Sequence, residues 1–423
     1  MKRVAIVTLG CKTNQAESAA ILGGLESRSY LSVDFNEPAD LYIINTCTVT
    51  NRTDYKSRYY IRKALEQKKL RTDVKIVVTG CYSQRSREEV MSLGDVDLVI
   101  DNQTKLDIPK LLDGEEHSFM DIMLATDFRY VPQQGMGERS RAFQKIQDGC
   151  DYYCSYCAVP YARGHIRSAK LEDVLAQARL FVANGYKEIV LGGVNLGLYR
   201  DDKHDLADVI TVFNDIDGLE IVRLSSLEPQ LFDSRLIEAI SKSSKVAPHF
   251  HIALQSGSDS VLKRMKRVYQ TARVKDLIAE LHAVIPYPAI GFDLIAGFPG
   301  ESDSELSETL DFLSFLDFCY LHVFSYSQRK GTPAAIMPGQ LDNHTKQHRA
   351  NLLIDLAEKK KHSYMQTLIE ARVLLRGIVE SSDIGVSTFL SDHFIRAYSS
   401  EPHSQGELIS IIPTKLFSDG LAN

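Results

Sequence analysis

The chain has 423 residues, of which 44% are hydrophobic and 25% charged, a balance typical of a globular protein with roughly two to four domains. It carries 49 Lys and Arg against 55 Asp and Glu, so its net charge of −6 excludes a globally basic nucleic-acid binder but not a local basic face. No apolar run approaches the ~20 residues that cross a bilayer, and the N-terminal run at residues 4–7 is too short for a secretory signal. We therefore expect a cytoplasmic protein with no membrane partner.

The first segment, residues 1–112, alternates Val- and Ile-rich runs with polar, helix-prone stretches. Strands are expected at residues 3–9, 40–44, 74–78 and 96–100, and helices at 15–27, 54–67 and 86–93. This alternation predicts a parallel sheet with helices on both faces.

A cysteine follows each of the first three expected strands: Cys11, Cys47 and Cys81. Because the carboxyl ends of parallel strands meet at one edge of a sheet, we expect these thiols to converge. Three cysteines can hold a 4Fe–4S cluster with one iron left open. The alternative metal is zinc, held by three thiolates and a water. If no metal binds, the three residues are separate core cysteines.

A second cysteine set, Cys150, Cys154 and Cys157, follows a strand expected at residues 143–146. Zinc motifs usually offer paired thiols and four ligands, whereas the nearest histidine here is His165. The CxxxCxxC spacing favours a 4Fe–4S cluster with one iron free for a substrate, and it is the hallmark of radical S-adenosylmethionine (SAM) enzymes. A structural or electron-transfer cluster is the alternative. Cys319 is expected in the core.

Strand and helix patterns continue to alternate through the middle of the chain. Strands are expected at residues 188–192, 221–225, 249–254, 290–295 and 320–325, and helices at 171–183, 258–265 and 302–315. With residues 143–146 these predict about six β/α units, a partial barrel with its site at the carboxyl ends of the strands. Eight residues are expected to contact a ligand at this site. Tyr156 lies in the cysteine loop, and the others follow the expected strands: Gly192, Gly193, Asn195, Glu228, Gln255, Ser256 and Gly297.

Four motifs give the chain a resemblance to a known family. They are LGCKTNQ at residues 9–15, NTCTVT at 45–50, TGCYSQ at 79–84 and LQSGSD at 254–259. Together with the CxxxCxxC loop, they resemble the radical SAM methylthiotransferases over nearly the whole chain. Residues 45–51 and 193–198 look most like the branch that acts on threonylcarbamoyladenosine in tRNA.

The resemblance implies an α/β protein of three domains. The first is a flavodoxin-like domain at residues 1–112. The second is a radical SAM core, a partial (β/α)6 barrel, at 136–367. The third is a small RNA-binding β-barrel of the TRAM type at 370–423.

The resemblance also implies two 4Fe–4S clusters. The cluster on Cys150, Cys154 and Cys157 would bind SAM, with the eight ligand-contact residues above around it, and cleave it to a 5′-deoxyadenosyl radical. The auxiliary cluster on Cys11, Cys47 and Cys81 would carry the sulfur. One SAM would methylate that sulfur, and the radical from a second would remove hydrogen from carbon 2 of the modified adenine. The implied partners are the tRNA anticodon stem-loop and a low-potential electron donor of the flavodoxin or ferredoxin type.

Two alternatives remain open from the sequence. Within the same chemistry, the target could be isopentenyladenosine in tRNA or an aspartate of a ribosomal protein. Outside it, the chain could be a non-catalytic iron–sulfur or zinc protein that binds RNA. No side chain can be assigned as a general acid or base.

The last segment and the basic residues bear on RNA binding. A helix expected at residues 343–368 leads to β-like runs at 374–379, 394–397 and 407–412, a length that suits a five-stranded barrel. Residues 370–423 hold four basic residues against seven acidic ones, whereas residues 52–75 hold nine against three, interleaved with Tyr55, Tyr59 and Tyr60. We therefore expect residues 52–75 to attract the phosphates, with a smaller basic cluster at 263–267, although a solvated helix face is the simpler alternative.

Overall fold

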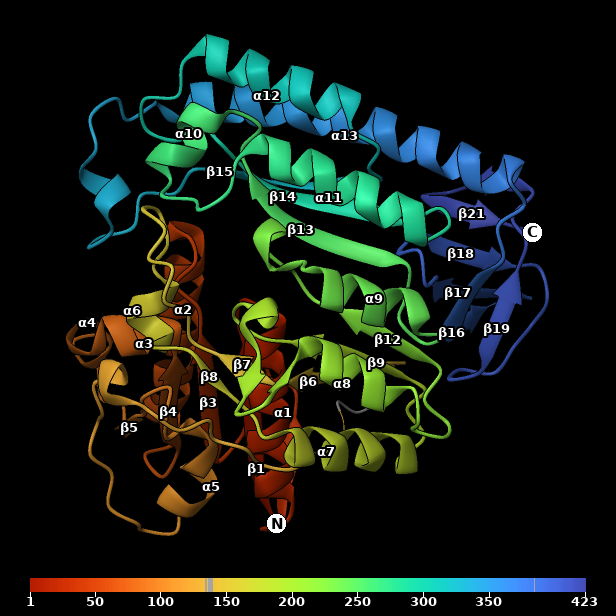
Figure 1. Cartoon of the computed structure of the whole chain (residues 1–423). Helices are drawn as coiled ribbons and strands as arrows, with labels where there is room; N and C mark the ends of the chain where they lie inside the picture. Colours follow the sequence, from red (N-terminus) through yellow and green to blue (C-terminus); the bar gives the residue numbers. More distant parts are fainter. Residues whose placement is uncertain (134, 136–139, 384) are drawn as a thin grey trace.

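The first sheet of the computed structural model is parallel throughout, with the strand order β2-β1-β3-β4-β5. The structure describes residues 1–133, 135, 140–383 and 385–423. The strands of this sheet are β1 (Lys2–Thr8), β2 (Tyr30–Val33), β3 (Leu41–Thr46), β4 (Lys75–Gly80) and β5 (Leu98–Val99). This order is that of a flavodoxin-like sheet, and it confirms the predicted fold class of this segment (Figure 1).

Helices cover both faces of this sheet. On one face, Ile21 and Leu25 of α1 pack against Val4 and Ile43, and on the other, residues of α2 such as Ile61 pack in a second cluster. The helices are α1 (Lys12–Glu26), α2 (Asn51–Leu70), α3 (Cys81–Arg85), α4 (Arg87–Met91) and α5 (Ile108–Leu111).

Six parallel strands in chain order form the partial barrel that the sequence predicted. They are β6 (Ala142–Lys145), β9 (Glu188–Gly192), β12 (Ile221–Leu224), β13 (His249–Gln255), β14 (Ala289–Ala296) and β15 (Tyr320–Ser325). Isolated bridges such as Leu227 with Ile252 join β12 to β13, so that the two three-stranded halves make one curved sheet. The predicted start of this domain, residue 136, lies outside the described residues.

The helices of the barrel lie on its outer side, as Figure 1 shows. The longer ones are α7 (Leu171–Ala183), α8 (Leu206–Phe213), α9 (Ser234–Lys242), α11 (Thr271–Val284) and α12 (Asp303–Phe315). Short elements complete it: α6 (Val159–Arg163), α10 (Asp259–Arg264), and the strand pairs β7 (Gln147–Asp148) with β8 (Arg167–Ser168) and β10 (Arg200–Asp201) with β11 (His204–Asp205).

The two faces of the barrel strands differ in chemistry. Side chains alternate between faces along a strand, and the apolar set, including Phe250, Ile252 and Phe292, packs in the core under the helices. The opposite set faces the inside of the barrel, here called the lumen, and it is largely polar. Its members include Glu188, Arg223, His249, His251, Asp293, Tyr320 and His322.

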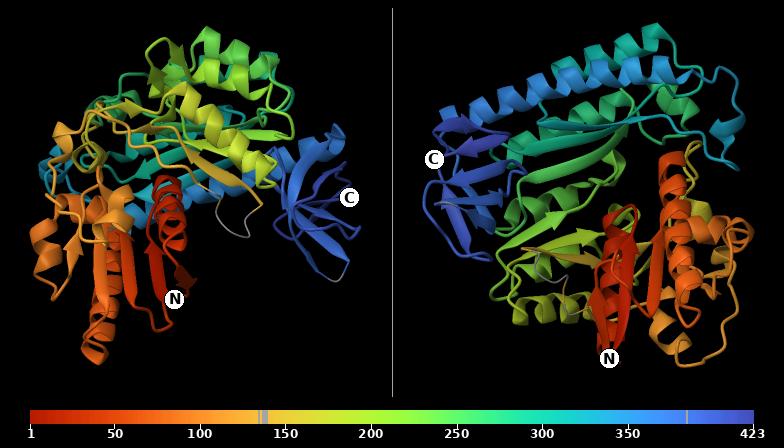
Figure 2. Two further views of the ribbon diagram at one scale, coloured as in Figure 1. Left: turned by 90° about the horizontal axis from the view of Figure 1, so that it is seen from below. Right: turned by 180° about the vertical axis from the view of Figure 1, so that it is seen from behind.

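The long helix α13 (Asn343–Glu370) runs along the barrel and ends at the C-terminal sheet (Figures 1 and 2). This sheet has six strands in the order β19-β16-β17-β18-β21-β20, one more than the five expected. They are β16 (Leu375–Asp383), β17 (Val386–Leu390), β18 (Arg396–Ser399), β19 (Leu408–Ile411), β20 (Lys415–Phe417) and β21 (Gly420–Ala422). None of the described helices is both long and apolar enough to cross a membrane.

A turn of the C-terminal sheet closes one end of the lumen. The Phe394 ring stacks on His249, with centroids 4.2 Å apart, and lies 5.2 Å from the Tyr320 ring. Arg223 of β12 donates hydrogen bonds to the carbonyl oxygens of Ser391 and Asp392, both at 3.2 Å. The tail therefore forms part of the wall of the barrel interior.

Candidate functional site

The structure brings Cys11, Cys47 and Cys81 to one edge of the first sheet. Cys11 caps the start of α1, Cys47 follows β3, and Cys81 begins α3 directly after β4. Gly10 has a φ of +90°, and a Cβ there would lie only 2.4 Å from Cys47 Sγ. Burial, with the nearby Cys81 and Cys11, raises the pKa of Cys47 to about 12. Cys81 and Cys11 thus lie close enough to Cys47 to act on its thiol.

Polar side chains tie the three strand ends together. Asn14 Nδ2 donates to the carbonyl oxygens of Leu9 at 2.8 Å and Thr46 at 3.0 Å. Thr46 Oγ1 donates to the Thr79 carbonyl at 2.6 Å and accepts from the Ser83 N–H at 3.2 Å. These buried bonds fix the loops that carry the cysteines.

Cys150, Cys154 and Cys157 lie in the loop between β7 and α6. The Cys157 N–H donates to the Cys154 carbonyl at 3.0 Å, and the Val159 N–H donates to Cys157 Sγ at 3.4 Å. Burial raises the pKa of Cys150 to about 11 and that of Cys157 to about 12, and Cys154 adds to both effects. Such thiols become thiolates when a bound metal supplies the positive charge.

The number of thiols favours a cluster over a single zinc ion. Each cysteine set supplies three thiols, whereas structural zinc sites usually take four protein ligands. A four-iron cluster binds each thiolate at a different iron and can leave one iron open. The ligand role of all six cysteines stays a prediction that this geometry supports.

A buried arginine contacts one cysteine of each set. Arg163 Nε lies 3.3 Å from Cys81 Sγ, and Arg267 Nη1 lies 3.0 Å from Cys154 Sγ. Arg267 also forms an ion pair with Glu228. A guanidinium beside a sulfur favours the thiolate, so both arginines suit an anionic metal–thiolate group.

Arg163 is the centre of a buried charge network between the first domain and the barrel. It binds Glu17 through Nη1 at 2.5 Å and Nη2 at 3.0 Å, and lies 3.3 Å from Asp148. Lys145 binds both acids at 2.7 Å, and Lys105 pairs with Glu17. Although burial opposes ionisation, these cations hold the pKa of Glu17 and of Asp148 far below the ordinary range.

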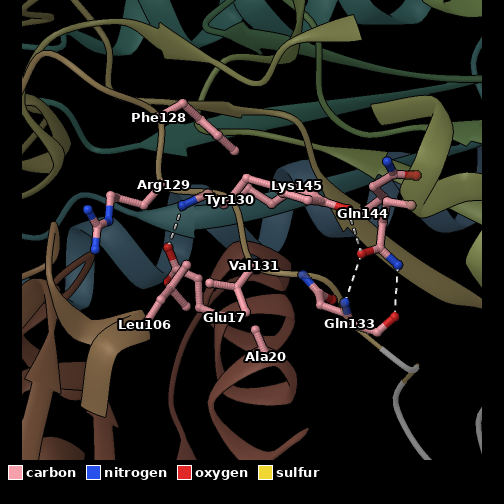
Figure 3. Close-up of a pocket in the computed structure, with 11 residues that line it drawn as sticks. Glu17, Ala20, Leu106, Phe128, Arg129, Tyr130, Val131, Gln133, Gln144 and Lys145 are labelled. Atoms are coloured by element: carbon pink, nitrogen blue, oxygen red, sulfur yellow. Dashed lines mark hydrogen bonds and ion pairs between the residues drawn. The ribbon is translucent and has the colours of Figure 1, made fainter. Parts of the chain in front are cut away.

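The connecting segment before the barrel seals this interface. Figure 3 shows residues 128–133 beside α1, where Lys145 reaches Glu17. Gln133 and Gln177 exchange two hydrogen bonds of 2.8 Å, and Lys145 Nζ lies 5.2 Å from the Phe128 ring centroid. The cavity left here is only about 20 Å³, enough for little more than one water. A substrate must therefore enter elsewhere.

A larger cavity of about 270 Å³ lies between the loops of the two cysteine sets. Val49 and Thr50, just after Cys47, form one wall, and Tyr156, just before Cys157, forms another. Gln255 also lines it, at a φ of +66° that is unusual for a residue with a side chain. The other lining residues are Asp293, Ile295, Phe324, Ser325, Tyr326 and Ser327.

Asn195 also has the properties of a ligand contact. Its buried side chain contacts the Cys150 thiol, and beyond that contact neither Oδ1 nor Nδ2 has a hydrogen-bond partner among the described residues. A bound SAM, which offers an amino group and a carboxylate, would satisfy such atoms. A Cβ on Gly192 would make an ordinary contact with the Gln144 carbonyl oxygen at 3.8 Å, whereas a Cβ on Gly193 would meet Gln147 Oε1 at 2.7 Å.

The remaining predicted cofactor contacts are occupied by protein groups. Glu228 is paired with Arg267, and the hydroxyl of Ser256 lies 3.4 Å from that of Thr309. A Cβ on Gly297 would overlap a side chain of α13. Tyr156, Gln255 and Asn195 are thus the best supported of the eight, and all eight stay predictions.

The basic residues divide into paired and unpaired sets. In residues 52–75, Arg58 pairs with Glu89 at 3.1 Å, and Lys68, Lys69 and Arg71 also pair with acids. In the second cluster, Arg264 binds Glu305 at 2.7 Å, and Arg267 is buried at the cysteine loop. The two arginines of that cluster are therefore structural, whereas Lys263 and Lys266 are exposed.

Two family profiles match the chain. Residues 3–101 match the family described as "Uncharacterized protein family UPF0004", and residues 145–313 match the radical SAM superfamily. The fold is similar to that of the radical SAM methyltransferase TsrM of Kitasatospora setae, with a TM-score of 0.62, 13% identity, and 79% of this chain and 77% of that chain covered. It is also similar to the cobalamin-dependent radical enzyme OxsB, with a TM-score of 0.54, 14% identity, and 85% and 56% covered.

Sequence relatives extend over most of the chain. The threonylcarbamoyladenosine tRNA methylthiotransferase MtaB of Bacillus subtilis is 40% identical, with 86% of this chain and 82% of that protein covered. The protein of the same name from Aquifex aeolicus is 36% identical, with 86% and 90% covered. The tRNA-2-methylthio-N(6)-dimethylallyladenosine synthase of Chromobacterium violaceum is 31% identical, with 100% and 98% covered.

The buried charge network generates a stability prediction. Arg163→Met should lower the free energy of unfolding by about 3–5 kcal/mol, because it leaves Glu17 and Asp148 short of a buried partner. Arg179→Met, the same change on the exposed face of α7, should stay within about 0.5 kcal/mol of wild type. Urea unfolding followed by circular dichroism measures both, and equal midpoints for the two variants would contradict the role given to Arg163.

Proposed function

The chain belongs to the family of radical SAM tRNA methylthiotransferases, and from this we propose that it adds a methylthio group to carbon 2 of N6-threonylcarbamoyladenosine next to the tRNA anticodon. Relatives named for this reaction are 35–40% identical over most of the chain. Those named for dimethylallyladenosine are 31–33% identical.

The structural observation that carries the proposal is the shared cavity. Val49 and Thr50 belong to the Cys47 loop, and Tyr156 belongs to the CxxxCxxC loop, yet they line the same space of about 270 Å³. One substrate bound there would face both cysteine sets. That is the arrangement that sulfur insertion requires, because the carbon that loses hydrogen must meet the sulfur.

The side chains have positioning and electrostatic roles in this proposal. A bound 4Fe–4S cluster and SAM supply the one-electron chemistry that opens an unactivated aromatic C–H bond, for which side chains alone offer no acid or base route. Arg267 balances negative charge at Cys154, and Arg163 does the same at Cys81. The Arg163–Glu17 bonds hold the two cysteine sets in one relative position.

The second cluster and the reductant belong to the proposal as well. Cys11, Cys47 and Cys81 would hold an auxiliary 4Fe–4S cluster, supported by their convergence and by Arg163. A low-potential donor of the flavodoxin or ferredoxin type would supply the electrons.

The tRNA would enter along α2. This helix starts at Asn51, directly after the cavity residue Thr50. Arg52, Lys56 and Arg62 are exposed and have no ion pair with any described residue, and Tyr55 and Tyr59 are also exposed. Such a face suits the phosphates and unpaired bases of an anticodon stem-loop.

Nucleoside analysis tests the reaction itself. Deleting the gene should remove 2-methylthio-N6-threonylcarbamoyladenosine from tRNA digests and raise its precursor by the same amount, as measured by mass spectrometry. Loss of the methylthio form of isopentenyladenosine instead would contradict the proposed substrate. The purified protein should restore the mark on threonylcarbamoylated tRNA in vitro.

Iron content tests the two clusters. Anaerobic reconstitution should give about eight irons per chain, and replacing Cys150, Cys154 and Cys157 by Ala should roughly halve that number. The triple Ala variant of Cys11, Cys47 and Cys81 should halve it as well. Cys319→Ala is the matched control, because Cys319 is a core residue whose thiol contacts the Ile290 carbonyl. About four irons in wild type would exclude the auxiliary cluster.

Salt-dependent binding tests the α2 face. Changing Arg52, Lys56 and Arg62 to Gln should weaken tRNA binding and reduce the slope of log K against log salt by about two units. The control changes Lys68, Lys69 and Arg71 to Gln, since acids already pair these three. Fluorescence titrations at several salt concentrations give the slopes, and a control slope that falls as much as the test slope would place the phosphate contacts elsewhere.

A further inference from the structure

Three polar residues occupy the lumen next to the substrate cavity. His251, Asp293 and His322 lie on the adjacent strands β13, β14 and β15. Asp293 lines the cavity itself, and His322 lies two residues before Phe324, another lining residue, so that both point from the same face of β15. The cluster is therefore continuous with the proposed substrate site.

The geometry of the cluster is held by its neighbours. His251 Nε2 lies 2.9 Å and His322 Nδ1 lies 3.5 Å from the same Asp293 oxygen, Oδ1. Tyr320 fixes the other side of His251, with its hydroxyl 2.7 Å from Nδ1. A Cβ on Gly291 would meet the Tyr320 ring at 2.0 Å, so the glycine is needed for this arrangement.

Asp293 is an anion with a free acceptor. Burial opposes ionisation, but contacts with His251 and His322 outweigh it and lower the pKa of Asp293 to about 2. Both contacts use Oδ1, and no hydrogen bond to a described residue uses Oδ2. The His322 side chain is 50% exposed, although it points into the lumen. The hydrogen-bonding atoms of the cluster that remain free, Asp293 Oδ2 among them, are thus available to a ligand.

A cation faces the same lumen from the first domain. Lys12 follows Cys11, its side chain is exposed, and its ammonium lies 5.5 Å from the Phe143 ring on β6. No ion pair within 4 Å among the described residues includes Lys12. Because Phe143 faces the lumen from β6, the Lys12 ammonium lies at the lumen wall opposite β13 to β15. Burial and Arg223 lower the pKa of His249 well below its usual value, and His251 and Lys12 add to this effect.

We propose that Asp293, His322 and Lys12 form a subsite for the threonylcarbamoyl substituent of the adenosine, in which Asp293 accepts its ureido N–H and Lys12 binds its carboxylate. His322 faces the threonyl hydroxyl. This subsite rests on the function proposed above, and it explains how the enzyme would select its nucleoside.

The chemistry of the alternative substrates agrees with this assignment. A threonylcarbamoyl group carries N–H donors, a hydroxyl and a carboxylate, whereas an isopentenyl group carries only hydrocarbon. An apolar group placed here would leave Asp293 Oδ2 and the Lys12 ammonium desolvated and without a hydrogen-bond partner. The lumen thus rejects an alkyl substituent as well as attracting the polar one.

The test compares the binding of two RNAs. These are anticodon stem-loops of one sequence, with and without the threonylcarbamoyl group, titrated against the full-length reconstituted protein. Wild type should prefer the modified RNA, and Lys12→Gln and Asp293→Asn should each reduce that preference about tenfold, with a smaller loss for His322→Gln. His282→Gln and Lys203→Gln, exposed changes outside the lumen, should leave the preference unchanged.

Several outcomes would overturn the subsite. An equal preference in wild type and in all three lumen variants would do so. So would an equimolar non-iron metal that is lost in His322→Gln, since the cluster would then be a metal site. Iron content is measured for each variant, because Lys12 adjoins Cys11, and a Lys12→Gln effect that merely follows iron loss also counts against the subsite.

Product formation separates this inference from the proposed function. Wild type that methylthiolates the modified RNA, with unchanged preference in the variants, would refute the subsite alone. Wild type that binds the modified RNA through these residues but yields no methylthio product would refute the reaction and keep the subsite.

Discussion

The arrangement of the whole molecule depends on the burial of one guanidinium. Arg163 lies on the short helix α6 after the CxxxCxxC loop, and it binds Glu17 of α1 across 146 residues of sequence. Removing such charges from water costs several kcal/mol per ion, and only a complete set of partners offsets it. Because the same guanidinium touches Cys81, its position ties the edge of the first sheet to the cysteine loop of the barrel.

The partial barrel separates two kinds of chemistry between its faces. The outer face buries aliphatic and aromatic side chains under the helices and provides the stability. The inner face is therefore free to carry histidines, carboxylates and arginines, whose burial would weaken an ordinary core. The polar layer at His251 and Asp293 lies directly beside the cavity, so the residues that cost stability lie where a ligand can use them.

Local patterns in the sequence predicted much of this structure. Alternating apolar residues gave the six barrel strands, and the repeated strand-end position of Cys11, Cys47 and Cys81 predicted their convergence. The short strands β2, β17, β20 and β21 were not predicted. No buried residue marks β2, and β20 and β21 have only three residues each, too few to show a period.

Contacts between distant residues were beyond the reach of sequence patterns. Arg267 stood in a basic run that suggested a phosphate surface, but its partner Glu228 is 39 positions away. The sequence alone does not mark Arg58 as paired, whereas in the structure it forms an ion pair with Glu89. Charge counts along a chain identify candidates, whereas only the folded structure shows which charges remain unpaired.

The Phe394 turn makes the C-terminal sheet more than an appended module. Its aromatic ring stacks on His249, and Arg223 caps the backbone of the same turn, so the tail supplies the floor of the barrel. A graft that exchanged this sheet for another small domain would leave the lumen open to bulk water at that end. The sequences of the C-terminal sheet and of the barrel are therefore coupled in evolution. A change in the Phe394 turn must still fit His249 and Arg223, which contact it.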